Sequence, residues 1–153
     1  MGTLLTDRQN EVLIEYRQFA IGMVTDIREL SFDSNSEKWI RYKNDQLYFQ
    51  SARSDHHADV RMQHWSAEPP VPQDRNWEVS SKFEFFSANN VLAVWTLTMG
   101  PADLQIDLNS GWYNMRAYCH GRTAIVRTNW DYDSGKGFPR SIERYLLQVW
   151  ATG

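Results

Sequence analysis

Short runs of alternating polar and apolar residues, separated by turn signals, are the feature that most constrains how this chain can fold. In the stretch GWYNMRAYCHGRT (111–123), polar side chains alternate with an apolar set made of Tyr113, Met115, Ala117 and Cys119. Successive side chains of a strand point to opposite faces of its sheet, so this pattern predicts a strand with one buried face. The free cysteine in the apolar set is expected to behave as a small hydrophobic residue.

The same kind of pattern recurs along the chain. Besides the 111–123 stretch, strands are predicted over 11–22, 46–52, 57–65, 77–86, 91–99, 104–108 and 142–150. In the run 77–86, Trp77 is expected to share one face with Val79 and Phe85. Polar residues over 26–39 and three prolines within 68–74 favour loops, because proline cannot donate a hydrogen bond to a sheet.

About eight or nine short strands without a long amphipathic helix predict an all-β fold, a single-domain antiparallel β-sandwich over residues 1–153. A β-barrel is the alternative. The 153 residues match the size of one domain and can bury a core without disulfides. Aromatic residues make up 14% of the chain, and they favour pleated, half-buried surfaces.

Composition and charge argue against several classes of protein. The net charge is −3 and no Lys/Arg cluster is present, so no nucleic-acid partner is expected. Cys119 is the only cysteine, which excludes an intrachain disulfide and a cysteine-based metal site. The N-terminal segment lacks the pattern of a signal peptide, and no apolar run approaches the roughly 18 residues of a membrane span. We therefore expect a cytoplasmic protein that does not enter a membrane.

Two groups of residues resemble metal-binding or catalytic sites. His56 and His57 are adjacent within SDHHADV (54–60), and neighbours on a regular strand cannot both ligate one ion. The favoured interpretation is a solvated loop that leads into a strand. Cys119 and His120 resemble a nucleophile and its base, but they too should face opposite ways. Although catalytic groups can converge from distant positions, we predict no metal, no cofactor and no enzymatic activity.

The polar segment NWDYDSGKGFPRS (129–141) is the candidate partner-binding site. It combines two aromatic residues with two carboxylates, namely Trp130, Asp131, Tyr132 and Asp133. Aromatic side chains supply apolar contact area, and flanking carboxylates attract a basic partner. The alternative is a polar hairpin loop with two incidental aromatic residues.

Several motifs together resemble those of small bacterial proteins similar to the competence-nuclease inhibitor Nin (ComJ). That group has an early Y-x-Q-F element, a proline-rich loop before a strand, an L-x-L-x-x-G-x-Y hairpin, and in many related proteins a final LLQLW strand. The matching residues here are Tyr16, Gln18 and Phe19 in EYRQF, the EPPVP segment, the run 106–122, and YLLQVW at 145–150. Trp112 occupies the variable place between Gly111 and Tyr113. The resemblance implies a β-sandwich that binds and blocks a protein, and it carries over no inhibitory residue.

We therefore expect an immunity or inhibitor protein that occludes a cognate bacterial toxin, for which a nuclease is one candidate. This interpretation predicts a flat acidic surface and scattered histidines. A small-ligand or carbohydrate-binding module is the alternative, and it predicts several exposed tryptophans in one concave patch. An enzyme would instead bring two or more histidines together in a cleft, from among His56, His57, His64 and His120.

Overall fold

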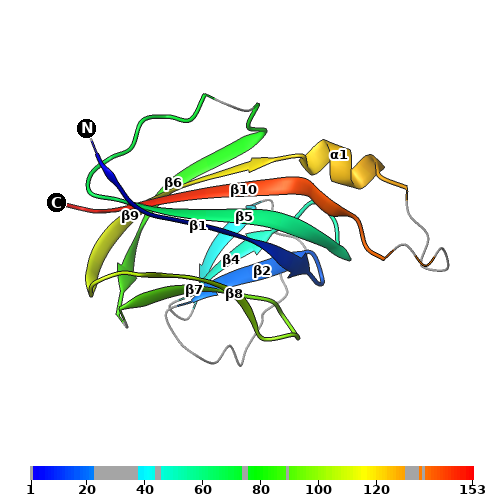
Figure 1. The fold of residues 1–153 in the computed structure, drawn as a ribbon, viewed down its shortest axis with the longest axis horizontal. Helices are drawn as coiled ribbons and strands as arrows, with labels where there is room; N and C mark the ends of the chain where they lie inside the picture. Colours follow the sequence, from blue (N-terminus) through cyan, green and yellow to red (C-terminus); the bar gives the residue numbers. More distant parts are fainter. Residues whose placement is uncertain are drawn as a thin grey trace.

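The computed structural model describes residues 2–22, 38–43, 46–73, 76–88, 90–129, 135 and 137–153, and these form two five-stranded sheets. The first sheet has the order β1-β5-β10-β9-β6, with the strands Leu4–Ile14, His56–Trp65, Arg140–Ala151, Gly111–His120 and Val79–Ser87. The second sheet has the order β3-β4-β2-β7-β8, with the strands Ile40–Lys43, Gln46–Gln50, Gln18–Gly22, Val91–Trp95 and Pro101–Asp107. Figure 1 shows the two sheets stacked as layers.

The inner faces of the two sheets share one hydrophobic core. At its centre, Phe19 stacks on Phe49 with ring centroids 5.0 Å apart, and Tyr145 meets Phe19 edge to face at 4.9 Å. Burying such a side chain stabilises the fold by about 1.5 to 3 kcal/mol relative to leaving it exposed. The predicted all-β sandwich is confirmed, since the described strands form two open sheets and not a closed barrel.

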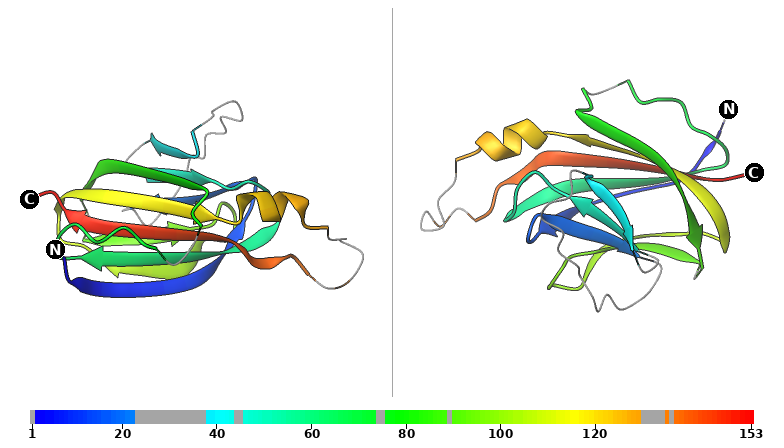
Figure 2. Two further views of the ribbon diagram at one scale, coloured as in Figure 1. Left: turned by 90° about the horizontal axis from the view of Figure 1, so that it is seen from above. Right: turned by 180° about the vertical axis from the view of Figure 1, so that it is seen from behind.

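The alternation within 111–123 is confirmed as a strand with one face in the core. Tyr113, Met115, Ala117 and Cys119 on β9 are all buried in the core cluster. Strand β10 is buried on both faces over its second half, with Leu146, Gln148 and Trp150 on the outer side. The connection between β5 and β6 arches across this outer face (Figure 1 and Figure 2, left).

Two features of the sheets differ from the prediction. The described residues contain ten strands instead of eight or nine, because the segment 11–22 is divided between β1 and β2 and β3 is a further short strand. The pairing of β10 with β5 is parallel, whereas the other strand pairs of the two sheets are antiparallel. These two strands are far apart in sequence, so no hairpin forces them to run in opposite directions.

The prediction of one strand over 11–22 is wrong, because a tight turn divides this segment and carries the chain from one sheet to the other. Tyr16 and Arg17 have positive φ angles of 52° and 60°, and the Gln18 amide donates to the Glu15 carbonyl at 3.0 Å. This is a two-residue turn with both central residues in the left-handed region, where Asn and Gly are usual. Because neither residue is Asn or Gly, the alternation alone could not reveal it.

The turn gives the first testable prediction. Replacing the exposed Tyr16 by asparagine, which tolerates a left-handed backbone better, should raise the free energy of unfolding by about 0.5 to 1 kcal/mol. Urea denaturation measures this change. Met99→Asn is the control, since Met99 is exposed and has no positive φ, and it should change stability by less than about 0.5 kcal/mol. A loss of stability in Tyr16→Asn would contradict the assignment of strain to this turn.

The short helix α1 (Arg122–Arg127) follows β9 and was not predicted. Its six residues are too few for a helical periodicity to be visible in the sequence. The carboxylate of Glu78, directly before β6, accepts hydrogen bonds from the amides of Gly121 at 2.9 Å and Thr123 at 3.1 Å. These bonds satisfy amide groups at the helix N-terminus that have no partner within the helix.

Candidate functional site

A groove lies on the outer face of the first sheet, beneath the connection between β5 and β6. The prolines of the predicted loop are irregular in structure, as expected, and Pro70 and Pro72 line one wall together with Trp77. The sheet side is lined by residues of β1, β5 and β10, including Trp65, Gln63 and Gln148. We call this the proline-loop groove, and its volume is about 290 Å³.

Polar contacts tie the wall of the proline-loop groove to the sheet. The guanidinium of Arg116 on β9 donates to the carbonyl of Pro69 at 2.6 Å. The Glu68 carboxylate lies 3.7 Å from the Arg116 guanidinium and 3.6 Å from the Lys82 ammonium group. These contacts fix the start of the connection to β9 and β6, so the wall of the groove is part of the folded structure.

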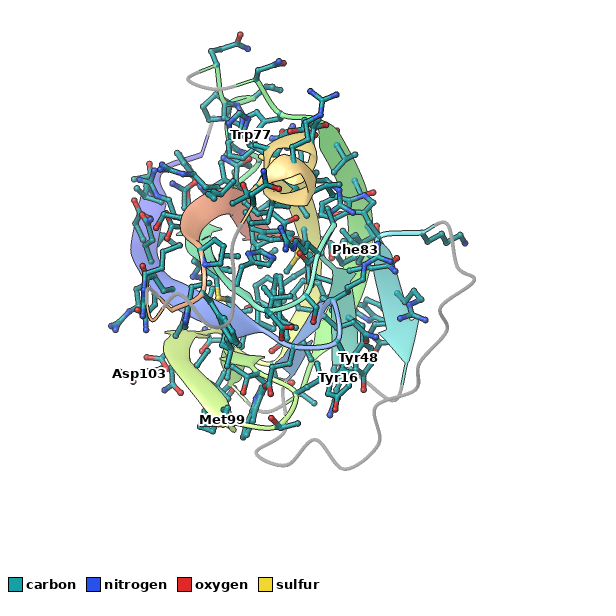
Figure 3. The ribbon with its side chains drawn as sticks, turned by 90° about the vertical axis from the view of Figure 1, so that its right-hand side faces the viewer. Tyr16, Tyr48, Trp77, Phe83, Met99 and Asp103 are labelled. Carbon is teal, nitrogen blue, oxygen red and sulfur yellow. The ribbon has the colours of Figure 1, made fainter. Side chains whose placement is uncertain are left out.

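Trp77 holds the other end of the connection against the sheet. Its ring lies 5.5 Å from the ring of Tyr118, and the neighbouring Asn76 carbonyl accepts a hydrogen bond from Nδ1 of His120 at 2.7 Å. Figure 3 shows Trp77 at the end of the molecule opposite Met99, on the side of the first sheet. The prediction that Trp77 shares a face with Val79 and Phe85 is wrong. Trp77 precedes β6 and packs against Tyr118 and His120 on the outer face, whereas Val79 and Phe85 face the core.

A chain of three side chains fixes the amide groups on the sheet side of the groove. The indole Nε1 of Trp65 donates to Oε1 of Gln63 at 3.0 Å, and Nε2 of Gln148 donates to the same oxygen at 3.3 Å. An indole nitrogen can only donate a hydrogen bond, so the acceptor on Gln63 is its amide oxygen. The group of Gln148 that bonds to the same oxygen must then be its amino group, which donates. The Oε1 of Gln148 is left as a buried acceptor without a partner among the described residues.

The charged side chains that line the groove are paired. Asp59 accepts a hydrogen bond from the Ser141 hydroxyl at 2.9 Å and lies 3.8 Å from the Arg144 guanidinium. Arg61 donates to the Asp7 carboxylate at 2.8 Å, and this bond holds the pKa of Asp7 below its usual value. The lining therefore presents neutral amides and aromatic rings beside charges that already have partners.

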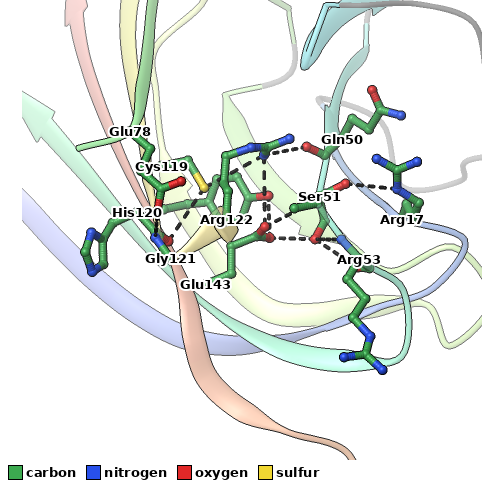
Figure 4. Close-up of polar contacts among 12 residues, drawn as sticks. Arg17, Gln50, Ser51, Arg53, Glu78, Cys119, His120, Gly121, Arg122 and Glu143 are labelled. Atoms are coloured by element: carbon green, nitrogen blue, oxygen red, sulfur yellow. Dashed lines mark hydrogen bonds and ion pairs between the residues drawn. The ribbon is translucent and has the colours of Figure 1, made fainter. Parts of the chain in front are cut away.

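A second polar cluster lies inside the sandwich, next to α1 (Figure 4). Ser51, His56 and Glu143 are all fully buried, and the Ser51 hydroxyl donates to Oε1 of Glu143 at 2.6 Å. Oγ of Ser51 also lies 2.9 Å from Nε2 of His56. The same carboxylate accepts hydrogen bonds from the Ala52 amide at 3.0 Å and from the Tyr145 hydroxyl at 2.7 Å.

This cluster contains the residue types of a catalytic triad but not its geometry. In a triad the carboxylate holds Nδ1 of the histidine, whereas here it binds the serine hydroxyl, which lies beside Nε2 of His56. Burial lowers the pKa of His56, so its imidazole is neutral. Burial and the neighbouring Glu143 carboxylate raise the pKa of Tyr145 well above its ordinary value, which keeps its hydroxyl a donor. The Glu143 carboxylate therefore has a structural role, since it joins Ser51 and Ala52 to Tyr145 at this end of the sandwich.

The predicted relation of Cys119 to His120 is confirmed. Cys119 is buried in the core, and His120 lies on the outer face beside Trp77. Burial strongly raises the pKa of the Cys119 thiol, so little thiolate forms. The histidines do not converge. His56 is buried beside Ser51 and Glu143, whereas the His57 ring lies 6.3 Å from the Phe138 ring and the His64 ring lies 6.1 Å from the Tyr113 ring.

Neither a metal cluster nor a membrane-spanning helix is found in the described part of the chain. No group of three or more potential ligands gathers there, and His56 and His57 point to opposite faces of β5. None of the helices described is long and apolar enough to cross a bilayer.

The predicted partner-binding residues Trp130, Asp131, Tyr132 and Asp133 lie outside the described residues. The structure describes the two ends of their loop, which follows α1 and precedes β10. Exposed aromatic residues also occur elsewhere, as a pair on adjacent strands. Phe86 and Trp112 are 40% and 57% exposed, with ring centroids 5.4 Å apart.

The chain is therefore a two-sheet β-sandwich with a groove on the outer face of its first sheet. No protein-family model and no curated protein sequence matches the chain. The crystal structure of ComJ from Bacillus subtilis, an inhibitor of the DNA-degrading activity of NucA, matches with a TM-score of 0.67 at 13% sequence identity. The match covers 99% of this chain and 98% of ComJ, so the two share their fold over the full length.

A second solved structure has a similar fold. It is the product of crocagin biosynthetic gene J, with a TM-score of 0.55 at 15% identity, covering 97% of this chain and all of that one. The resemblance seen in the sequence motifs is therefore confirmed for the fold.

Proposed function

We propose that this chain is an immunity or inhibitor protein that binds and occludes a cognate protein toxin, with a nuclease as the first target class to test. The observation that carries the proposal is the full-length match to ComJ, which is a nuclease inhibitor. The positions of the histidines agree with it, because they do not converge in one cleft as the alternative of a histidine-based enzyme predicts. We further propose that the chain acts in the cytoplasm, as one domain.

The proposed contact surface is the loop between α1 and β10. Trp130 and Tyr132 would enter the target cleft as aromatic anchors, and Asp131 and Asp133 would pair with basic side chains around it. A nuclease cleft binds phosphates and is commonly basic, so a chain with a net charge of −3 complements it. Inhibition by this mechanism is steric and electrostatic, and the inhibitor itself carries out no chemical step.

The aromatic anchors give the second testable prediction. Trp130→Ala and Tyr132→Ala should each weaken binding to the captured partner by about 30-fold, which corresponds to about 2 kcal/mol. Surface plasmon resonance measures the change. Tyr42→Ala is the matched control, because Tyr42 is an exposed aromatic residue on β3, and it should leave the affinity within about twofold. Unchanged binding in both loop variants would show that the contact surface does not include this loop.

The carboxylates allow the electrostatic part to be separated from the steric part. The double variant Asp131→Asn/Asp133→Asn should slow association by about tenfold at low salt. The difference from the native chain should disappear at high salt, since screening removes the attraction in both proteins. A salt-independent loss would indicate damage to the loop itself.

A further inference from the structure

We propose that the proline-loop groove binds a small neutral saccharide of one or two rings. This goes beyond the inhibitor proposal, since the groove lies on the outer face of the first sheet and does not include the loop assigned to the toxin. The inference rests on three observations about the groove, namely its unpaired polar atoms, its aromatic walls and the pairing of its charged side chains with opposite charges.

Two buried polar atoms among the groove residues lack partners within the described part of the chain. One is Oε1 of Gln148, whose side chain is only 3% exposed. The other is the indole Nε1 of Trp77. Both atoms are closed to solvent, so a ligand reaches them only when a side chain that covers them shifts, and a hydrogen bond made there offsets the cost of leaving them unpaired. The first can only accept a hydrogen bond and the second can only donate one.

A hydroxyl group meets both requirements, because it donates one hydrogen bond and accepts others. The orientation of Gln148 is fixed by Trp65 through Gln63, so its free oxygen is held in place before any ligand arrives. Binding would therefore not have to order this side chain, which lowers the entropic cost. A ligand with several hydroxyls can also engage the neighbouring amides of Gln9 and Gln63.

The aromatic walls suit the apolar faces of a sugar ring. Trp65 and Trp77 both line the groove and are half-buried, so each offers part of its ring to a ligand. Their amphipathic rings combine an apolar face with a polar edge. The volume of about 290 Å³ lies at the lower end of ligand-pocket sizes, which limits the ligand to a small molecule.

The charges around the groove favour a neutral ligand over an ion. Arg144 lies near Asp59, and Arg61 is hydrogen-bonded to Asp7. An anionic ligand would have to compete with these carboxylates for the guanidinium groups. A neutral saccharide needs no such exchange, and the paired side chains can still donate or accept further hydrogen bonds at its edge.

The test is a calorimetric titration of the full chain with glucose, galactose, mannose, N-acetylglucosamine, cellobiose and maltose. We expect at least one to bind with a Kd of about 1 mM or below and to change the tryptophan fluorescence. Gln148→Met keeps the size of the side chain and removes the acceptor, and Trp77→Phe keeps a ring and removes the donor. Each should weaken binding by about tenfold or more. Trp112→Phe, on an exposed site away from the groove, should leave it unchanged.

Near-ultraviolet circular dichroism of each variant establishes that it is folded. Three results would overturn the proposal. The first is that no saccharide binds, and the second is that the native chain and both groove variants bind equally. The third is that a neutral peptide such as acetyl-alanyl-alanine amide binds and the sugars do not. These outcomes are independent of the inhibitor proposal, because toxin binding is measured without added sugar and through other residues.

Discussion

Replacing Glu143 by alanine is expected to lower the free energy of unfolding by about 3 to 5 kcal/mol, as for other buried charges whose network is broken. Glu143 is fully buried and accepts hydrogen bonds from Ser51, Ala52 and Tyr145. Without the carboxylate, these buried donors lose their acceptor. The Arg122 guanidinium, 4.0 Å away, loses its ionic partner as well. Urea or thermal denaturation measures the loss.

Two further variants make this prediction specific. Glu84→Ala removes an exposed carboxylate from β6 and should change stability by less than about 0.5 kcal/mol. Glu143→Gln keeps the volume and one acceptor oxygen, so it should cost less than the alanine variant. A loss below about 1 kcal/mol in Glu143→Ala would mean that the cluster does not hold this end of the sandwich together.

Replacing Gly121 by alanine should lower the free energy of unfolding by about 3 kcal/mol or more, because two costs combine. Gly121 has a φ of 85°, which alanine adopts only with strain. A Cβ atom there would also lie 2.0 Å from the carbonyl oxygen of Ile142, so β9 and β10 would have to move apart. Chemical denaturation measures the loss.

Gly100 separates these two costs. It has a similar φ of 81°, but a Cβ atom there would have no neighbour within 4 Å. Gly100→Ala should therefore cost only the backbone strain, about 1 to 2 kcal/mol. Equal losses in the two variants would contradict the close approach of Gly121 to Ile142.

The strands could be predicted where one face is buried, and the turns could not always be predicted. Alternation located β5 and β9, because the apolar side chains on their inner faces enter the same core. It failed at Tyr16 and Arg17, where tertiary contacts hold a left-handed turn without Asn or Gly. The parallel pairing of β5 with β10 gives no signal in the sequence of either strand, since the direction of pairing depends on the path of the whole chain.

The groove could not be predicted, because its residues meet only after folding. Gln63 and Gln148 are 85 positions apart, and each lies on a face that the alternation marks simply as outward. The signal that could have been used is the position of Trp65 and Trp77 on either side of the proline-rich segment. The loop with Trp130 and Asp131 remains a prediction from composition.

The inhibitor proposal is tested most directly by asking whether the chain silences a protein that it binds. The chain is immobilised, a lysate of its source cells is passed over it, and the retained protein is purified and assayed for DNA degradation or another toxic activity. We predict that adding the chain back abolishes this activity at one equivalent, with a Kd of about 1 nM or below. Full activity of the retained protein at saturating chain, or no stoichiometric partner when the toxin is expressed, would contradict the proposal.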